Sequence, residues 1–518
     1  MLILLPVFGL CLTALAILLL RLAKPKFKYP WMLAAGGATL ALTSVFVWQI
    51  HFPDSFSLPP WQLVTAFFYA PTWLADGTSW AYALTLAALA AAVIWTSVVR
   101  AEKEPLAWAG TLILAALGIL AVAAGNPLTL LLAWSAIDLF ELITMLRSTE
   151  GENQTRDVII AFAARLAGTG LVLWANLVSV SAGTQLDFRS IPPSTGIYLL
   201  MAAGLRLGVL PLHLPYRQEN VIRRGFGTAL RLVSAAASLA LLARIPAPAL
   251  KSALTPYLLV LAAIAALYAG WMWLRASDEI LGRPFWILGF ASLAVAESLR
   301  GNPTGSTGWG VAMILCGGVL FLFSARQRSV LWLPFIGLWA LSSLPFSLTA
   351  SAWQKGNSLS WLFILPFLPA EGLLMAGFFR HCLHPGDTSL ESQEKWVKVI
   401  YPAGLLMLMA AAILLGVWGW NGARVLGLWW LAIIVILLTS AFIFLSRREL
   451  IRTSESTLSS QWSRILPLNW FYSIIVVLYN FVHKITDILT ASLEGEGGLL
   501  WSFLLLVLIL SILSTRGH

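Results

Sequence analysis

The chain has 518 residues, of which 59% are hydrophobic and only 11% are charged, and its formal net charge is +10. A soluble domain carries about 25% charged residues. This chain has too few charged side chains to form a water-soluble surface, so its surface must be solvated by lipid. Its basic residues lie in short clusters between apolar runs, which argues against binding of nucleic acid. The composition therefore indicates a polytopic integral membrane protein in contact with the lipid bilayer.

Membrane spans are expected wherever an apolar run reaches about 20 residues, the length that crosses the hydrocarbon core. The runs are rich in Leu and Ala and lack the alternation of a barrel, so they predict an all-α protein with about 16 transmembrane helices. The first run has no basic leader and no clear cleavage site, which favours a retained helix over a signal peptide. The spans are expected at residues 1–21, 31–50, 77–99, 106–124, 127–146, 157–181, 195–212, 226–243, 252–274, 281–299, 307–325, 329–350, 358–380, 398–418, 425–446 and 498–514.

The distribution of basic residues between the spans predicts the orientation. The loops and span ends that follow odd-numbered spans hold 23 Lys and Arg, whereas those that follow even-numbered spans hold 7. Basic loops favour the cytoplasm. We therefore expect both termini outside, in what we take to be a bacterial inner (cell) membrane.

Residues 457–493 form neither an ordinary span nor a plain loop. Apolar side chains fall on one side of a helix there, and charged and amide side chains interrupt the pattern. This predicts an amphipathic helix, or a helix pair, that lies laterally along the cytoplasmic surface or across neighbouring helices before the last span. It acts either as a membrane-surface anchor or as a brace between subunits.

Ionisable side chains inside the spans point to a structural or functional role, because placing a charge at mid-membrane costs at least about 2.5–3.5 kcal/mol on insertion scales. Two acids and three arginines fall within four consecutive spans, where they form either static ion pairs or part of an ion path. All nine lysines lie at span ends or in loops, and an arginine effectively cannot release its proton. In chain order, the candidates of these four spans are Asp138, Glu141, Arg165, Arg206 and Arg231.

Pro211 interrupts the seventh span, next to Arg206 and His213. A proline inside a helix removes a backbone hydrogen bond, and broken helices often line hydrated cavities, so we expect a helix break here. Later in the chain, Glu371 either faces a hydrated gap or snorkels and pairs with an arginine, of which we favour the second. Glu297 closes its span and is expected at the membrane interface.

Motifs for catalysis, cofactors and metals are missing from the sequence. The three cysteines show no metal or disulfide spacing, and there is no Gly-rich dinucleotide loop, haem-type cysteine pair or iron–sulfur cysteine set. His381, Cys382 and His384 are close in sequence, but their expected surface location and the lack of a fourth ligand argue against a metal site. We predict no catalytic residue, cofactor or metal for this chain.

Several segments resemble the antiporter-like membrane subunits shared by respiratory complex I, Mrp-type cation/proton antiporters and membrane-bound hydrogenases. In that family, helix 7 carries a lysine followed by a Pro-x-His step, and here the stretch is Arg206-Leu-Gly-Val-Leu-Pro211-Leu-His213. The helix 6 pattern Ala-Phe-x-x-Arg is matched at residues 161–165, and two later turns are echoed at 277–283 and around Pro345. The resemblance covers roughly residues 77–380 and the C-terminal arrangement. It implies two inverted five-helix repeats, each with a broken helix, and places the second break at Pro345.

The sequence also departs from the pattern of the family. The family has a glutamate after a tryptophan in helix 5, whereas here Ser135 follows Trp134 and the acids come one and two turns later. The helix 7 lysine is Arg206, and Arg231 lies near the place where helix 8 usually offers a histidine or lysine. The second repeat has no lysine or histidine in residues 314–323.

The resemblance implies a membrane subunit of a multisubunit ion-translocating complex, which moves protons, or exchanges a cation for a proton, together with partner membrane subunits. Its intramembrane charge chain would be altered. The alternative is a non-conducting scaffold that docks a transport or redox partner, and a partner for bicarbonate uptake stays open. The expected parts are N-terminal helices (1–105), a first repeat (106–245), a second repeat (252–380), additional helices (395–456), the lateral segment (457–493) and the last span (498–514).

Overall fold

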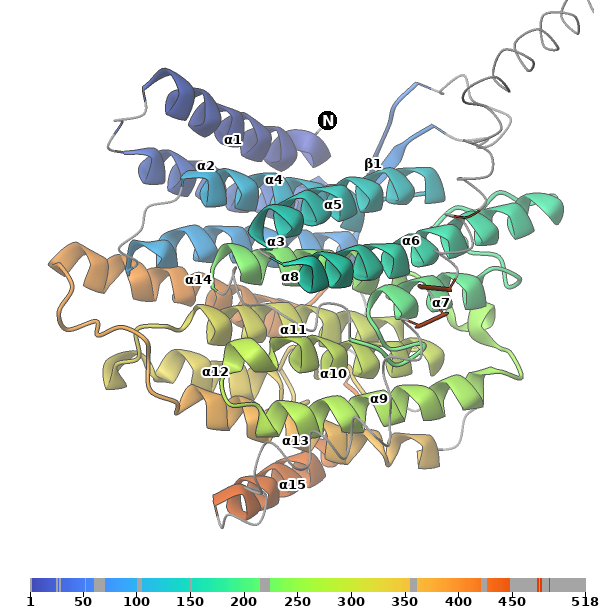
Figure 1. Cartoon of the computed structure of the whole chain (residues 1–518). Helices are drawn as coiled ribbons and strands as arrows, with labels where there is room; N and C mark the ends of the chain where they lie inside the picture. Colours follow the sequence, from blue (N-terminus) through green and yellow to red (C-terminus); the bar gives the residue numbers. More distant parts are fainter. Residues whose placement is uncertain are drawn as a thin grey trace, which may run out of the picture. The chain divides into compact units, whose positions relative to one another are not determined.

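The computed structural model of the chain describes residues 2–24, 27, 29–51, 53–59, 70–99, 105–149, 151–214, 224–354, 361–420 and 426–447, with isolated positions between 473 and 484. These residues are mainly helical, as the apolar runs predict (Figure 1). The expected lateral segment at 457–493, apart from those isolated positions, and the expected last span at 498–514 lie outside the described residues.

Helices make up most of the described residues in the first half of the chain. They are α1 (Leu5–Ala23), α2 (Pro30–Trp48), α3 (Gly77–Thr96), α4 (Pro105–Val122), α5 (Pro127–Ser148), α6 (Glu152–Ser181), α7 (Gly196–Arg206) and α8 (Phe226–Leu242). Short 3₁₀ turns accompany them at Leu2–Leu4, Gln49–His51, Ser97–Val99 and Ala247–Leu250.

The second half continues in the same way. Its helices are α9 (Thr255–Arg275), α10 (Glu279–Leu299), α11 (Pro303–Leu322), α12 (Trp332–Ala340), α13 (Phe367–Cys382), α14 (Lys395–Trp418) and α15 (Trp429–Arg447). Two further 3₁₀ turns lie at Arg328–Val330 and Trp361–Ile364. Each of the first fifteen expected spans overlaps one of these helices.

Twelve helices in the described part of the chain are long and apolar enough to cross a membrane. The exceptions are α7 and α8, which are shorter apolar helices, and α12, which has 9 residues. The polytopic, mainly α-helical architecture expected from the sequence is therefore confirmed, whereas the expected count of 16 spans is not, since 12 helices of the described residues meet the length and composition of a span.

One small sheet departs from the all-α expectation. Strand β1 (Asp54–Ser57) pairs antiparallel with β2 (Thr72–Ala75), so that Phe56 faces Trp73 across the pair. Their rings lie 6.2 Å apart. The sequence signal was hidden because both strands are short and lie between apolar runs, where cross-strand pairing decides the conformation.

Polar side chains start several of the helices and satisfy their free N–H groups. Asp76 caps α3 in a capping box with Ser79. Asn126 and Asn302 each precede a proline and cap α5 and α11 respectively. The side-chain oxygen of each asparagine accepts a hydrogen bond from the backbone N–H three residues later in the chain, at 3.0 Å. Because the cap, the proline and the apolar run coincide, these helix starts are encoded locally.

The helices α7 and α12 both end inside their expected spans. α7 stops at Arg206, and Gly208 follows with a positive φ of 78°. α12 stops at Ala340, and Ser343 and Phe346 follow with φ of 55° and 67°. The irregular segments behind them contain Pro211 and Pro345 respectively. Charged and hydroxyl side chains gather at both places.

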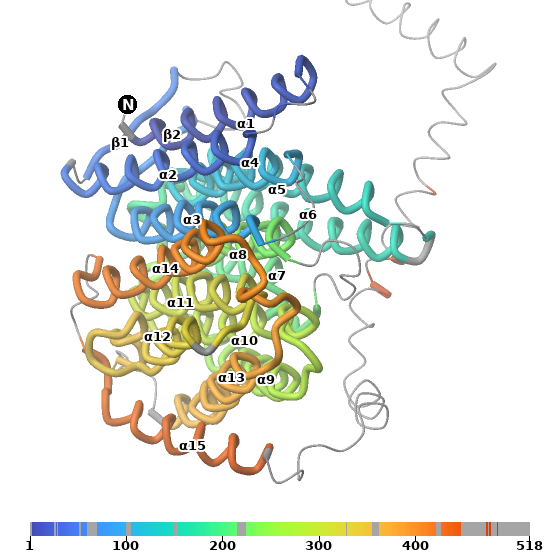
Figure 2. Tube along the Cα trace, turned by 90° about the vertical axis from the view of Figure 1, so that its left-hand side faces the viewer, coloured from blue at the N-terminus to red at the C-terminus, as the bar shows by residue number. Residues whose placement is uncertain are grey.

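The core of the described part lies around α3 and α11. Every residue of α11 from Gly305 to Leu322 is buried, and α3 is buried along most of its length. In contrast, α1 and α15 lie at opposite edges of the stack of helices in both views and expose most of their residues (Figures 1 and 2). Buried tryptophans fill the second half, where Trp273 stacks against Trp286 with ring centroids 5.2 Å apart.

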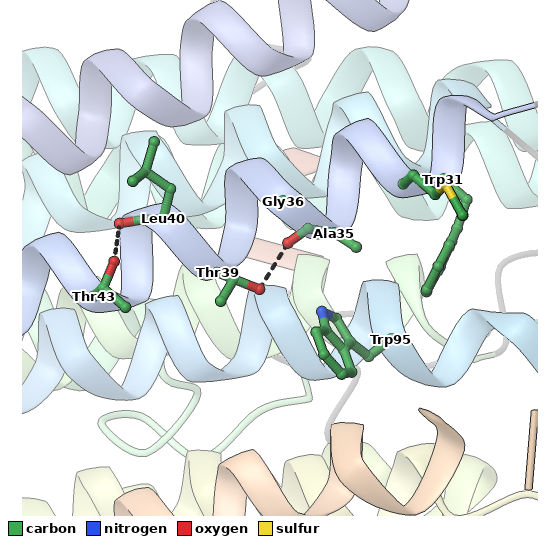
Figure 3. Close-up of a pocket in the computed structure, with 8 residues that line it drawn as sticks. Trp31, Ala35, Gly36, Thr39, Leu40, Thr43 and Trp95 are labelled. Atoms are coloured by element: carbon green, nitrogen blue, oxygen red, sulfur yellow. Dashed lines mark hydrogen bonds between the residues drawn. The ribbon is translucent and has the colours of Figure 1, made fainter. Parts of the chain in front are cut away.

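A groove of about 520 Å³ follows α2 on the outside of the helix stack (Figure 3). Residues of α2 line it from Trp31 at one end to Leu40 and Thr43 at the other, and Trp95 of α3 lies between these ends. The hydroxyls of Thr39 and Thr43 donate to carbonyls of their own helix, at 2.8 and 2.9 Å. The groove therefore presents a mainly apolar surface on which the threonine hydroxyls are satisfied, which is compatible with hydrocarbon. Nε1 of Trp95 has no hydrogen-bond partner among the described residues.

Candidate functional site: two buried acid clusters

The five charged side chains that the sequence singled out in spans five to eight meet in one place. Asp138 and Glu141 come from α5, and each is about 1% exposed. Arg165 comes from α6, Arg206 from the last residue of α7, and Arg231 from α8, each between 5% and 6% exposed. We call these five residues the arginine cluster.

Asp138 is held mainly by Arg206. The two terminal nitrogens of Arg206 donate to the two carboxylate oxygens of Asp138, at 2.6 and 2.7 Å. This is the bidentate geometry in which a guanidinium and a carboxylate interact most strongly. Nη1 of Arg165 approaches the same carboxylate at 3.4 Å.

Glu141 is shared between the other two arginines. Its Oε2 accepts a hydrogen bond from Arg165, and its Oε1 accepts one from Arg231 at 2.7 Å. Since Arg165 contacts both acids, the contacts run without interruption from Arg206 through Asp138, Arg165 and Glu141 to Arg231. The arginine cluster therefore ties α5, α6, α7 and α8 together.

The surroundings of Arg206 fix its position. Its Nη1 also lies 3.3 Å from both the carbonyl oxygen of Arg165 and the hydroxyl of Thr169, and its guanidinium lies 4.1 Å from the ring centre of Trp134. Gly168 leaves room for it, because a Cβ there would be 2.7 Å from Cγ of Arg206. Cation–π contact and hydrogen bonds thus compensate the burial of this charge.

The chemistry of the arginine cluster follows from its charges. Three guanidinium groups and two carboxylates leave one net positive charge when all are ionised. The guanidinium groups keep their protons, so only the two carboxylates could exchange one. Each carboxylate is contacted by two arginines, and its protonation would remove the partner charge of both.

Pro211 and His213 lie behind the break of α7. His213 is about 1% exposed, and its Nδ1 lies 2.8 Å from the carbonyl oxygen of Pro211. Its backbone N–H donates to the carbonyl of Gly208 at 2.9 Å. The contacts described for the histidine therefore fall within its own turn.

A second group of acids lies in the second half of the chain. Glu371 of α13 accepts hydrogen bonds from the hydroxyl of Ser343 at 3.0 Å and from Nε1 of Trp353 at 2.9 Å. The pairing of Glu371 with an arginine, which the sequence favoured, is not found among the described residues. The reason is that the irregular segment after α12 brings neutral donors to this carboxyl group.

Glu297 of α10 lies deeper than its position near the helix end suggested. It is 0% exposed, and it accepts hydrogen bonds from the backbone N–H of Trp353, at 3.1 Å, and from the side-chain amide of Asn302. Sequence reasoning missed Trp353, Asn302 and Ser343 as partners of the acids. The available signal was weak, since only the Asn-Pro helix start marked this region.

A second ion-pair network joins the two halves near the start of α10. Glu279 contacts Arg224, which precedes α8, at 2.7 Å, and Arg326, which follows α11, at 2.6 Å. Arg224 also contacts Asp387, behind α13, at 2.6 Å. Only Glu279 is a buried acid in this group, with a side chain 3% exposed against 57% for Asp387. Sequence reasoning counted the two arginines only toward the orientation and noted Glu279 only as part of the echoed turn at 277–283.

His381, Cys382 and His384 do not come together as metal ligands. Nε2 of the buried His381 lies 3.1 Å from the carbonyl of Trp273, and its ring stacks on that tryptophan at 4.3 Å. Within the described ranges, no three His, Cys, Asp or Glu side chains are placed to hold a metal ion.

His384, just beyond the end of α13, is expected to make stability depend on pH. Partial burial, and next the charge of Arg380, lower the pKa of this imidazole from its ordinary value of 6.5. As the pH falls below 6.5, the unfolded chain binds a proton that the folded chain refuses, so stability decreases. The melting temperature of His384→Gln, measured in detergent from about pH 8 to about pH 5, should therefore fall slightly less than that of the wild type. Parallel curves would contradict this.

Solved structures of other proteins share the fold of this chain. No protein-family model matches the sequence, and no curated protein matches it. Among solved structures, a chain of the Mrp complex from Dietzia sp. DQ12-45-1b is 14% identical with a TM-score of 0.72, over 100% of this chain and 63% of that one. The chain has the fold of antiporter-like subunits.

Two more solved structures support the same conclusion. A chain of the membrane-bound sulfane sulfur reductase, an archaeal respiratory membrane complex, has a TM-score of 0.64 at 13% identity and covers 99% of both chains. A chain of respiratory complex I from Thermus thermophilus has a TM-score of 0.61 at 21% identity, over 85% of this chain and 100% of that one. The present chain spans only 63% of the Mrp chain. The antiporter-like fold is therefore shared across these complexes while the sequences have diverged widely.

Proposed function

We propose that this chain is a membrane subunit of a multisubunit ion-translocating complex, in which it takes part in moving protons, or in exchanging a cation for a proton, together with partner membrane subunits. The antiporter-like fold supports the proposal, because the similar chains come from an Mrp complex and from two respiratory complexes. The observation that carries it is the arginine cluster, a continuous buried row of charges across four helices at the break of α7.

We propose that the row of intramembrane charged residues differs from the one that the resemblance implies. Arg206 occupies the place at which the resemblance implies a lysine, and a guanidinium cannot deliver a proton. Asp138 and Glu141 would then be the only exchangeable groups of the arginine cluster. Its arginines would set the electrostatic potential that a moving proton meets, without carrying the proton themselves.

The second candidate function is a non-conducting scaffold. The observation that favours it is that both carboxylates of the arginine cluster are fully engaged by arginines, which suits a static lock between helices. Such a chain would dock a transport or redox partner and move nothing. The two candidates differ in whether any proton flux depends on the carboxylates.

The topology implied by the resemblance is part of the same proposal. It comprises about 16 spans, inverted repeats at 106–245 and 252–380 with breaks near Pro211 and Pro345, and a lateral helix at 457–493 before the last span. Both termini would face outward, in a bacterial inner membrane. The support is that α7 and α12, which would correspond in the two repeats, are both short and both followed by an irregular segment.

Replacing Asp138 by asparagine and Glu141 by glutamine tests the transport proposal. The complex is reconstituted in liposomes and its cation-dependent proton flux is measured per folded complex. We expect the double variant to lose at least about tenfold in flux, because a positioned proton carrier typically contributes about 10²–10⁴-fold.

The wild-type complex and a variant with an exposed exchange, Glu391→Gln, serve as controls in the same liposomes. Unchanged flux in the double variant would show that these acids carry no protons. No flux in the wild-type complex would favour the scaffold.

A further inference from the structure

The second half of the chain contains a pair of buried acids that the arginine cluster does not reach. Glu297 lies in the last turn of α10 and Glu371 in the second turn of α13, and both are 0% exposed. Between them lies Trp353, which belongs to the irregular segment that follows α12 and is 1% exposed. We call these two glutamates and the tryptophan the acid pair.

Trp353 contacts both acids with different N–H groups. Its backbone N–H donates to Oε1 of Glu297 at 3.1 Å, and its indole Nε1–H donates to Oε2 of Glu371 at 2.9 Å. The residue has a positive φ of 54°, a conformation that non-glycine residues rarely adopt. One residue therefore fixes the positions of two carboxyl groups that come from different helices.

The acid pair differs from the arginine cluster in its partners. The donors to the two glutamates are neutral: the N–H groups of Trp353, the hydroxyl of Ser343 and the amide of Asn302. Among the described residues, neither glutamate lies within 4 Å of a basic side chain. Two buried carboxylates without such a partner repel each other and are poorly solvated, so the pair is expected to hold a proton.

Further polar groups with unused hydrogen-bonding capacity border the site. Arg300 follows the last residue of α10, three residues after Glu297. It is 4% exposed, and its Nε and Nη1 have no hydrogen-bond partner among the described residues. Ser351 is 1% exposed and its hydroxyl is likewise unpartnered, while its carbonyl accepts from the same Asn302 nitrogen that donates to Glu297. These groups could bind polar species that exchange a proton with the acids.

We propose that Glu297 and Glu371, joined by Trp353, form a proton-binding site in the second half of the chain. The site holds one proton: when the O–H bond of one glutamic acid breaks, the carboxylate of the other binds the proton, and the charge of the pair remains −1. The N–H bonds of Trp353 stay intact and only orient the carboxyl groups. The use of this proton in transport rests on the proposed function, whereas its binding does not.

Infrared difference spectroscopy of the full chain in lipid nanodiscs tests the proton-binding site directly. The carbonyl stretch of a protonated carboxyl group is resolved from that of a carboxylate, and pH steps reveal which groups change. We expect such a band in the wild type, a reduced band in Glu297→Gln and in Glu371→Gln, and its loss in the double variant. The variant Glu391→Gln, at an exposed glutamate of the same chain, should keep the band. An undiminished band in the double variant, or no band in the wild type, would overturn the proposal.

The variant Trp353→Phe separates the two contacts of the tryptophan, since it removes the indole N–H and keeps the backbone N–H. The component of the carbonyl band that is lost in Glu371→Gln should shift in Trp353→Phe, while the component that is lost in Glu297→Gln should stay in place. This also covers the case in which the double glutamine variant does not fold. Two unshifted bands would overturn the assignment of Trp353 as the link between the acids.

Measuring proton flux through the reconstituted complex distinguishes proton binding by the acid pair from the use of that proton in transport. If the acid pair supports transport, Glu371→Gln lowers the flux at least tenfold while Glu391→Gln does not. If the wild-type complex shows no flux, the proposed function fails, and the infrared bands still decide whether the acid pair binds a proton.

Discussion

Replacing Asp138 with asparagine is expected to lower the free energy of unfolding by about 3–5 kcal/mol, the cost of breaking a buried ion pair by removing one partner. Arg206 would lose its bidentate carboxylate, and Arg165 would lose a second acidic neighbour. Both guanidinium groups would stay buried, because α6 and α7 hold them away from water. The measurement is denaturant or thermal unfolding of the purified chain in detergent, together with the folded yield.

A double-mutant cycle isolates the pair itself. Arg206→Gln alone should be similarly destabilising, because it leaves Asp138 with only the 3.4 Å contact to Arg165. The combination Asp138→Asn with Arg206→Gln keeps the net charge of the arginine cluster and replaces the ion pair by two neutral amides. It should therefore be clearly less destabilised than the sum of the two single variants. Strictly additive losses would show that the two residues do not act as a pair.

Replacing Glu279 with glutamine is expected to have a comparably large effect, again about 3–5 kcal/mol. Its carboxylate is the shared partner of Arg224 and Arg326, at 2.7 and 2.6 Å, and its side chain is 3% exposed. The substitution would remove the acid that the two arginines share, and of the acids described in this network only the exposed Asp387 would remain, on Arg224. Because Arg224 precedes α8 and Arg326 follows α11, the contact between the two halves should loosen. Limited proteolysis and thermal unfolding in detergent measure both effects.

Asp387 provides a matched control for this prediction. It contacts the same Arg224 at 2.6 Å, but its side chain is 57% exposed. An exposed ion pair contributes only about 0–1 kcal/mol, so Asp387→Asn should leave the melting temperature almost unchanged. If the two substitutions were equally costly, burial of the carboxylate would not be the cause.

The positions of most helices could be predicted from the sequence because the physical requirement is local. An apolar run of sufficient length forms a helix whatever its neighbours are, and Asn-Pro starts such as Asn126-Pro127 mark where it begins. The break near Pro211 was foreseeable from the proline itself, whereas the break near Pro345 was expected only from the resemblance to the antiporter-like subunits. The gathering of Asp138 and Glu141 with the arginines of the next three helices also followed, since consecutive helices tend to be neighbours.

Other features depend on contacts between distant segments and left no local pattern. Trp353 and Glu297 are 56 positions apart, and Arg224 and Asp387 are 163 apart. The pairing of each arginine with a particular acid depends on the rotation of each helix about its axis. An apolar run without a distinct polar face does not determine that rotation. Glu297 was assigned to the interface because it is near the end of its helix, yet the segment after α12 folds over it and buries it.

The complete burial of α11 has a consequence for the order of events during synthesis. Its neighbours include α3 and α8, which emerge earlier, and α14, which emerges later; Gly318 fits between Leu89 of α3 and Leu408 of α14, and a Cβ there would lie 3.1 and 3.2 Å from them. While the ribosome is still making residues 395–418, this glycine-containing face has its contact with α3 but lacks its contact with α14. The nascent second half therefore stays incompletely packed until α14 has been synthesised and inserted. During that time it is accessible to membrane chaperones and proteases.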